Sequence, residues 1–295
     1  MDPVRKAYLE LHIAVLLFGI TAILGDLILL PALIITWWRV LLTSVSLLFI
    51  IRVRRIIREM PWQKVVRFMG IGVLVSLHWL TFYGAIKLSN ASITLTALAT
   101  ASFFTSLIEP LITRQRVKVY EISLGIIILP GMILVARNTE LSMLNGLWVG
   151  LLSALLAATF TALNKKFIGE ADEKDITFLE LGSAFLFLSM VIPFVAYFSA
   201  EPLQVWPQRG LDWIYLLVLA LLCTTLAYVL ALRSLQQLSA FASTLTVNLE
   251  PVYGIILAWL LLNDNEEVSG GFYLGVLIIL TAVFSYPLLR RRYGS

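Results

Sequence analysis

The sequence predicts an all-α polytopic membrane protein in which ten transmembrane helices form two inverted five-helix repeats. Its composition is the first observation: 60% of the 295 residues are hydrophobic and 14% are charged, with a mean hydropathy of +0.92. Soluble domains are about half apolar and a quarter charged, so this chain has too few charges to cover a water-soluble surface. The other two observations are the length of its apolar runs and a weak internal repeat.

Ten apolar runs are candidates for membrane-spanning helices, although the fifth and sixth are short. A helix needs about 17–25 apolar residues to cross the hydrocarbon core. The runs cover residues 11–30, 33–51, 68–86, 91–112, 119–136, 146–163, 176–198, 213–232, 240–262 and 272–289. They do not show the alternation of a β-barrel, and their short connections leave no room for a soluble domain.

The positive charges predict the orientation of these helices. With the N-terminus inside, 18 of the 22 Lys and Arg residues fall on the inner side, and the others are Arg39, Lys87, Arg137 and Arg209. Cytoplasmic loops carry such an excess. We therefore expect a multi-pass protein of the plasma membrane, or of the inner membrane in a bacterium, with both termini in the cytoplasm. The net charge of +4 reflects this topology, and nucleic-acid binding is not expected.

Short signals recur in the two halves of the chain. The sequence FYGAIK (82–87) closes the third run and YVLALR (228–233) the eighth, while SLG (123–125) and YLG (273–275) open the fifth and tenth. We therefore expect one repeat at residues 1–140 and another at 141–295. Because five helices are an odd number, the repeats must have opposite orientations. Inverted repeats commonly surround a midplane site that opens alternately to either side.

The stretch SAFASTLTVNLEPVYGIILAWLLL (239–262) has an acid and a proline near its centre. A charge at the centre of a membrane helix costs about 2.5–3.5 kcal/mol on insertion scales, so Glu250 needs a wet or paired environment. Pro251 frees a backbone acceptor in the preceding turn. Asn248 lies off the polar face that helical spacing predicts, which consists of Ser239, Ser243, Thr246, Glu250 and Tyr253. Glu250 could bind cargo or a proton, or it could hold the bundle together through a hydrogen bond.

Further candidates lie in the third and eighth runs. His78 could relay protons or serve as a hydrogen-bonded packing residue. Aromatic side chains could form a wall for a partly apolar ligand, although packing is an alternative role for each. The candidate residues for binding or coupling are therefore Glu250, Tyr253, Thr246, Asn248, His78, Trp79, Tyr83 and Tyr228.

Three other charged residues are candidates for gating or structural ion pairing. Arg39 starts the second run, where it could guard the outer mouth or meet an anionic group, beside Trp37 and Trp38, which are typical of an interface belt. Glu109 is expected near the cytoplasmic end of the fourth run, paired with Arg114 or Arg116. Glu180 is expected near the inner interface, pairing with a basic loop residue or lining an inward vestibule.

Catalytic and metal chemistry have no support in the sequence. One cysteine and two histidines cannot assemble a standard zinc site, and neither HExxH nor a Walker A pattern occurs. We expect no catalytic residue, no metal and no cofactor. The sequence favours a carrier. A channel or non-transporting membrane scaffold is the main alternative, and an intramembrane enzyme is the least favoured one.

The stretches FYGAIKLSNASITLTALA, GLLSALLAATFTALNKKF and ALRSLQQLSAFASTLTVNLEPVYGIILAWLLL resemble EamA-type members of the drug/metabolite transporter superfamily. The resemblance implies ten helices in two inverted halves, with helices one to four and six to nine around a cavity and five and ten bracing it. It also implies secondary active transport of small organic metabolites, commonly outward. The expected partners are a metabolite, membrane lipid and a proton as coupling ion, in a monomer or homodimer.

Overall fold

The computed structural model describes residues 2–138, 141–199, 201–250, 252–253 and 270–293, and all regular structure among them is helical. The α-helices of the first half are α1 (Pro3–Leu27), α2 (Ala32–Leu48), α3 (Val53–Glu59), α4 (Trp62–Leu88), α5 (Ala91–Leu98), α6 (Ala101–Thr113) and α7 (Val119–Asn138). Those of the second half are α8 (Leu144–Phe167), α9 (Glu173–Phe198), α10 (Gly210–Ala220), α11 (Ala227–Leu235), α12 (Ala240–Val247) and α14 (Gly270–Tyr293). Short 3₁₀ turns at Leu141–Met143 and Ile168–Glu170 flank α8.

Within these described segments, six helices are long and apolar enough to cross a membrane, or seven if the bent pair α2–α3 forms one span. The apolar part of α7 is shorter, at Val119–Pro130. Residues 251 and 254–262 of the expected ninth span, 240–262, are among those that the structure does not describe, and ten spans remain a prediction. The short helix α3 is bent by 86° from α2, so the second crossing ends near Leu48 and the chain turns aside before α4 begins.

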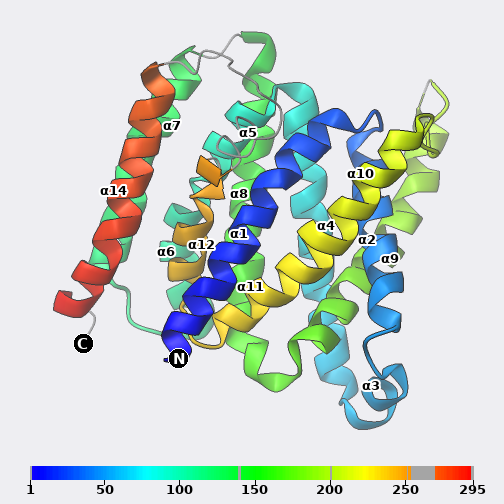
Figure 1. Ribbon diagram of the computed structural model, residues 1–295, viewed down its shortest axis with the longest axis horizontal. Helices are drawn as coiled ribbons and strands as arrows, with labels where there is room; N and C mark the ends of the chain where they lie inside the picture. The colour runs from blue at the N-terminus through cyan, green and yellow to red at the C-terminus, as the bar shows by residue number, and fades with distance from the viewer. Residues whose placement is uncertain (1, 139–140, 200, 251, 254–269, 294–295) are drawn as a thin grey trace.

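The helices form one bundle in which neighbours along the chain are often not neighbours in space (Figure 1). Helix α4 packs on α8 and α9, α1 packs on α11, and α2 packs on α9. Helices α7 and α14 lie side by side at one edge of the bundle, away from α2 and α9. The bracing position expected for the fifth and tenth helices stays a prediction, because it depends on the ten-helix count.

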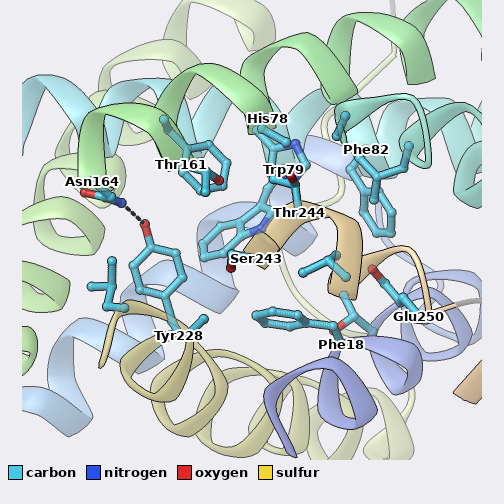
Figure 2. Close-up of a pocket in the computed structure, with 18 of the residues that line it drawn as sticks. Phe18, His78, Trp79, Phe82, Thr161, Asn164, Tyr228, Ser243, Thr244 and Glu250 are labelled. Carbon is cyan, nitrogen blue, oxygen red and sulfur yellow. Dashed lines mark hydrogen bonds between the residues drawn. The ribbon is translucent and has the colours of Figure 1, made fainter. Parts of the chain in front are cut away.

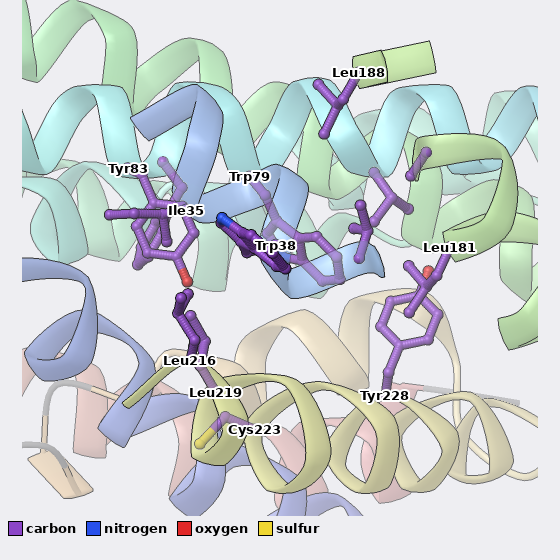
Figure 3. Packing of buried hydrophobic residues seen from close by; sticks show 14 of the residues in the cluster. Ile35, Trp38, Trp79, Tyr83, Leu181, Leu188, Leu216, Leu219, Cys223 and Tyr228 are labelled. Atoms are coloured by element: carbon purple, nitrogen blue, oxygen red, sulfur yellow. The ribbon is translucent and has the colours of Figure 1, made fainter. Parts of the chain in front are cut away.

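The largest core cluster joins α2, α4, α9, α10 and α11 around Trp38, Trp79 and Tyr83. Figure 3 shows Tyr83 and Tyr228 at opposite ends of this cluster, with the two tryptophans between them. The aromatic rings supply a large apolar surface and carry a polar atom at one edge, which lets them pack and hydrogen-bond together.

Two expected spans are interrupted, contrary to the continuous helices predicted at 91–112 and 240–262. The first is broken by a turn at Ala99–Thr100 between α5 and α6, and the second by a turn at Asn248–Leu249 after α12. At the first break the Thr100 hydroxyl donates to the carbonyl of Ala97 at 2.7 Å. Such local side-chain bonds offer the backbone an alternative to the helical ladder.

The two breaks meet in space. The side-chain amide of Asn248 donates a 3.0 Å hydrogen bond to Ser102 Oγ, just after the first break. Both residues are buried, and α12 packs on α6. The contact therefore fixes two irregular stretches of backbone against each other at a depth where lipid could not satisfy them.

A third irregularity lies between α10 and α11. Residues Leu221–Leu226 form one π-helical stretch, in which Thr224 Oγ1 donates to the Leu219 carbonyl at 2.6 Å and Thr225 Oγ1 to the Ala220 carbonyl at 2.9 Å. Short π-helical stretches inside helices occur frequently at functional sites. This one faces the buried side chain of Arg39.

Candidate functional site

A cavity of about 120 Å³ lies in the middle of the bundle, between the two helix breaks (Figure 2). Its walls come from α1, α2, α4, α5, α6, α8, α11 and the end of α12. Four rings supply much of the apolar wall: Phe18, Trp79, Phe82 and Phe160. The polar groups that face the cavity include Arg39, His78, Thr161, Asn164, Tyr228, Ser243, Thr244, Asn248 and Glu250. A mostly apolar wall with a few placed polar groups is typical of small-molecule sites.

Glu250 lines this cavity directly after the Asn248–Leu249 turn. Only 5% of the residue is exposed, and no described residue forms a hydrogen bond or ion pair with its carboxyl. Arg39 lines the same cavity without forming an ion pair to it. The site therefore presents one acidic and one basic group to any occupant. The adjoining Pro251 lies outside the described residues.

The other members of the polar face predicted around Glu250 do not share one environment. Ser243 lines the cavity, but Thr246 Oγ1 bonds to the Ala242 carbonyl at 2.8 Å, and the Tyr253 hydroxyl lies 3.0 Å from His12 Nδ1. Asn248, predicted to lie off that face, does line the cavity. Helical spacing alone therefore did not identify which of these side chains face the cavity, and two that do not, Thr246 and Tyr253, lie on either side of the turn at Asn248–Leu249.

Arg39 is buried beside the cavity, only 1% exposed, which corrects its predicted place at the outer mouth. Its guanidinium donates to the Tyr83 hydroxyl at 2.8 Å, to Thr224 Oγ1 at 2.5 Å and to the Cys223 carbonyl at 3.1 Å. Its central carbon also lies 4.0 Å from the centroid of the Trp79 ring. The planar, multi-donor guanidinium suits such a combination of hydrogen bonds and ring stacking. Tyr83 is fully buried and is held here by Arg39 rather than by a ligand.

Tyr228 lies at the end of the core cluster opposite to Tyr83 (Figure 3). Its ring makes an edge contact with Trp79, with centroids 6.0 Å apart, and its hydroxyl donates to Glu180 Oε2 at 2.5 Å. Glu180 is completely buried and joins neither a basic loop residue nor the cavity lining, so both predicted environments for this residue are wrong. Its partners besides Tyr228 include Asn164, whose amide donates to the same oxygen at 3.3 Å.

His78 faces the cavity from α4 and is anchored on α8. Its Nδ1 lies 2.9 Å from the Ser153 hydroxyl and 3.0 Å from the Ser153 carbonyl. The Ser153 hydroxyl in turn donates to the His78 carbonyl at 3.0 Å. The ring also packs on Phe160. These contacts fit the hydrogen-bonded packing role predicted for this histidine, and its alternative role as a proton relay stays a prediction.

Glu109 does not pair with the basic residues that follow it. Its two carboxylate oxygens accept from the backbone N–H groups of Ala240 and Phe241, at 2.9 and 2.7 Å. These are the first donors of α12, which are unsatisfied within the helix and carry its positive dipole end. The acid is thus a helix cap supplied from another helix. The prediction that Glu109 pairs with Arg114 or Arg116 was wrong because it considered only residues that are near in the sequence.

The two tryptophans before Arg39 lie inside the bundle rather than in an interface belt. Trp37 Nε1 donates to Ser189 Oγ at 2.8 Å, and Trp38 Nε1 donates to the Val205 carbonyl at 2.9 Å. Trp38 also packs on Trp213. Both indoles therefore hold α2 to the second half of the chain.

The model of the EamA-like transporter family matches residues 5–137 and, a second time, residues 144–286. The chain belongs to the EamA-like transporter family. The EamA-like chain is also similar to a protein of Bacillus subtilis (strain 168) named "Uncharacterized transporter YxxF", with 24% identity over 259 residues, 85% of this chain and 80% of that protein. A solved protein, titled only "Crystal structure of protein", superimposes with a TM-score of 0.73 over 99% of both chains at 16% identity, which shows a shared fold.

Family membership and the apolar helices together make this EamA-like chain a multi-pass membrane transporter. Among the described residues no group of three His, Cys, Asp or Glu side chains could hold a metal ion. Sequence reasoning missed several cavity residues, notably Asn164, Thr161 and Phe18. Asn164 gave a usable signal, because an amide at the end of an otherwise apolar run needs a partner. Phe18 gave none, since it is one apolar residue among many in its helix.

Proposed function

We propose that the protein is a secondary active transporter that exports small organic metabolites by alternating access, with the central cavity as its cargo site. The observation that carries this proposal is the cavity itself, enclosed by helices of both halves where two broken helices cross. Broken helices at midplane depth are the usual setting of substrate sites in such carriers, because the interruption exposes backbone and side-chain polar groups to a cargo.

The lining suggests the chemistry of the cargo. Aromatic rings of the lining, such as Trp79 and Phe160, suit an apolar or planar body, while Glu250 and Arg39 offer charges of opposite sign. Of the candidates from the sequence, we propose direct contact with cargo for Glu250, Asn248, His78, Trp79 and Tyr228. Tyr83 acts through Arg39, and Thr246 and Tyr253 have structural contacts instead.

The packing of helices supports two inverted repeats at 1–140 and 141–295. Contacts recur in matched pairs when α1 is taken as equivalent to α8, α2 to α9, and α4 to α10 and α11. The contact of α1 with α11 then corresponds to that of α8 with α4, and the contact of α4 with α9 corresponds to that of α10 with α2. Helix α7 pairs with its own counterpart α14. The family model also matches each half separately. Equivalent halves of opposite orientation would let the cavity close to one side of the membrane as it opens to the other.

Both ends of the described chain and α3 lie at the same end of the bundle (Figure 1). The basic residues of α3 and those near the C-terminus, Arg290, Arg291 and Arg292, therefore gather at one face. This distribution supports a plasma-membrane protein with cytoplasmic termini. Exposed apolar side chains on the flank of α9, including Met190 and Phe194, suit contact with lipid tails.

The proposal is tested by finding a cargo and measuring exchange. Purified protein is screened for thermal stabilisation by defined pools of amino acids, nucleosides, organic acids and amines, since a ligand that binds only the native state raises the melting temperature. A compound that stabilises the protein is then used, radiolabelled, in proteoliposomes preloaded with the unlabelled compound. Transient uphill accumulation by counterflow is expected from a carrier. Rapid equilibration without counterflow would indicate a channel, and product formation an enzyme.

A further inference from the structure

Glu180 is a buried acid with no cation beside it. The residue has no exposed surface, and no described Lys, Arg or His forms an ion pair with it. Helix α4 packs closely on the backbone of this residue, because a Cβ added at Gly72 would lie 1.9 Å from the Glu180 main-chain carbonyl oxygen. A carboxylate in such a place is costly unless it is neutralised or bonded on both oxygens.

The charged and titratable groups of the helices packed around α9 are engaged elsewhere. Tyr228 of α11 is the titratable group that faces the carboxyl directly. The others bind different partners. Three have neutral partners: Arg39 binds Tyr83 and Thr224, His78 binds Ser153, and Lys165 binds the Leu235 carbonyl. Two have acidic partners: Arg67 binds Glu170, and Arg233 approaches Glu10 and Glu173. The acids of α9's own first turns, Glu173 and Asp175, bind Gln236 and Arg55. No described side chain therefore supplies a counter-charge to Glu180.

The hydrogen bonds around the carboxyl leave two acceptors without a donor. Oε2 of Glu180 accepts from both the Tyr228 hydroxyl and the Asn164 amide, whereas Oε1 has no partner. The amide oxygen of Asn164 is also buried and unpartnered. Buried polar atoms without partners are rare in native structures, and each one calls for an explanation such as a missing hydrogen or ion. A hydrogen on the carboxyl would turn one of these two acceptors into a donor.

We propose that Glu180 is the site that binds the coupling proton, separate from the cargo contact at Glu250. This proposal rests on the transport function proposed above. The proton binds Oε1 from water on one side of the membrane and leaves to water on the other, so the carboxyl alternates between a neutral and an ionised form. A sodium site is disfavoured because the described groups that contact the carboxyl are donors, the Tyr228 hydroxyl and the Asn164 amide N–H, whereas a hard cation requires several oxygen ligands.

The same partners connect this proton site to the cargo site. Tyr228 and Asn164 line the cavity (Figure 2), and both also donate hydrogen bonds to Glu180 Oε2. An ionised Glu180 binds the Tyr228 hydroxyl and the Asn164 amide strongly as hydrogen-bond donors. A protonated Glu180 is a weaker acceptor, so these two donors become more available to a cargo. Cargo and ionised carboxylate therefore compete for two shared donors. Competition of this kind changes cargo affinity with protonation, which is the requirement for coupling.

The first test uses the proton itself as probe and needs no cargo. Infrared difference spectra are recorded for the full-length protein in nanodiscs, over a pH series from about 5 to about 9, around the range in which buried carboxyls titrate. Wild type should show the carbonyl band of a protonated carboxylic acid that fades as the pH rises. Glu180→Gln should lose the part of this band that belongs to Glu180 and keep any part that belongs to Glu250, while the control Glu121→Gln, which removes a buried acid paired with Lys118 outside the cavity, should keep the Glu180 part. A titrating band as intense in Glu180→Gln as in wild type would overturn the proposal.

A second variant keeps the test informative if Glu180→Gln does not fold. Tyr228→Phe keeps the ring and removes the hydroxyl that donates to Glu180 Oε2. Because that donor stabilises the ionised form, the band should fade at a higher pH in this variant than in wild type. A midpoint that does not move would show that the titrating acid is not Glu180.

Transport then separates failure of this proposal from failure of the proposed function. Glu180→Gln should retain counterflow of the cargo but lose, by about tenfold or more, the accumulation driven by a pH gradient. If wild type performs no counterflow, the carrier function itself is wrong. If wild type performs counterflow and Glu180→Gln responds to a pH gradient as wild type does, the carrier stands and the proton site is wrong.

Discussion

At the scale of single residues, the charge of Arg39 is held inside the bundle by neutral partners. Arg39 donates to a phenol, a threonine hydroxyl and a backbone carbonyl, and it stacks on Trp79. These partners come from α4 and from the π-helical stretch between α10 and α11. One side chain thereby links three helices from both halves of the chain at the edge of the cavity.

We predict that Arg39→Lys destabilises the protein although it keeps the charge. A lysine ammonium cannot reach three acceptors in different directions or stack on a ring, so buried acceptors lose their donor, at a cost of about 2 kcal/mol or more. The melting temperature in detergent should fall clearly below that of wild type. Arg58→Lys serves as the control, because Arg58 of α3 is exposed and forms no ion pair with a described residue, and such surface substitutions usually change stability by no more than about 0.5 kcal/mol. Equal effects of the two substitutions would contradict this account of Arg39.

Single-residue reasoning from the sequence located part of the site. It identified Glu250, His78, Trp79 and Tyr228 because a polar or aromatic group inside an apolar run requires a partner or a cavity. It misplaced Arg39 and Glu109, because their partners are Thr224 and the start of α12, far away in the sequence. Spacing along one helix carries no information about which distant helix will face it.

At the scale of helices, the sequence predicted where spans lie better than how they are built. The apolar runs at 68–86, 146–163 and 176–198 fall inside α4, α8 and α9. The breaks at Ala99–Thr100 and Asn248–Leu249 were not predicted, since neither contains proline or glycine. They depend on side-chain bonds such as that between Asn248 and Ser102, which form only after the two spans cross.

The cap that Glu109 gives to α12 leads to a prediction for that helix. Glu109→Ala should remove both acceptors from the first turn of α12 and destabilise the protein by about 1–2 kcal/mol, the range for loss of an N-terminal cap. Hydrogen exchange should increase at residues 240–243 while exchange in α4 stays as in wild type. Unchanged exchange at the start of α12 would show that the cap is not needed.

Close packing between α4 and α9 gives a second prediction at this scale. Gly72→Ala would place a methyl group 1.9 Å from the Glu180 carbonyl oxygen, so one helix must shift, at a cost of about 1–3 kcal/mol. Gly70→Ala lies two residues away on the same helix, with nothing within 4 Å of the added carbon, and should be neutral or slightly stabilising. Thermal unfolding of the two variants side by side measures the difference. A Gly72→Ala protein as stable as Gly70→Ala would mean that α4 and α9 are not packed this closely.

At the scale of the whole molecule, a basic residue of the first half and an acidic residue of the second half hold the same position within their helices. Arg39 is the eighth residue of α2 and Glu180 is the eighth residue of α9. Arg39 bonds to Tyr83 on α4, and Glu180 bonds to Tyr228 on α11. This correspondence supports the proposed inverted repeat.

The orientation of the molecule can be tested with cysteines in a Cys223→Ser background. Ile57 of α3 is 75% exposed and Leu141, before α8, is 86% exposed, at opposite ends of the bundle. If the basic end is cytoplasmic, Leu141→Cys should react in whole cells with a reagent that cannot cross membranes. Ile57→Cys should react only after the cells are opened. The reverse pattern would contradict cytoplasmic termini.

The central claim is that cargo crosses the membrane through the cavity beside Glu250, and the most direct measurement is counterflow by Glu250→Gln in proteoliposomes. Glutamine keeps the size of the side chain and can hydrogen-bond, but it cannot ionise. We predict that Glu250→Gln lowers counterflow by about tenfold or more per folded protein and changes its dependence on pH, a loss of roughly 1.4 kcal/mol or more of stabilisation. Glu121→Gln, which alters a buried acid away from the cavity, should match wild type. Counterflow by Glu250→Gln equal to wild type, with the same pH dependence, would contradict the claim.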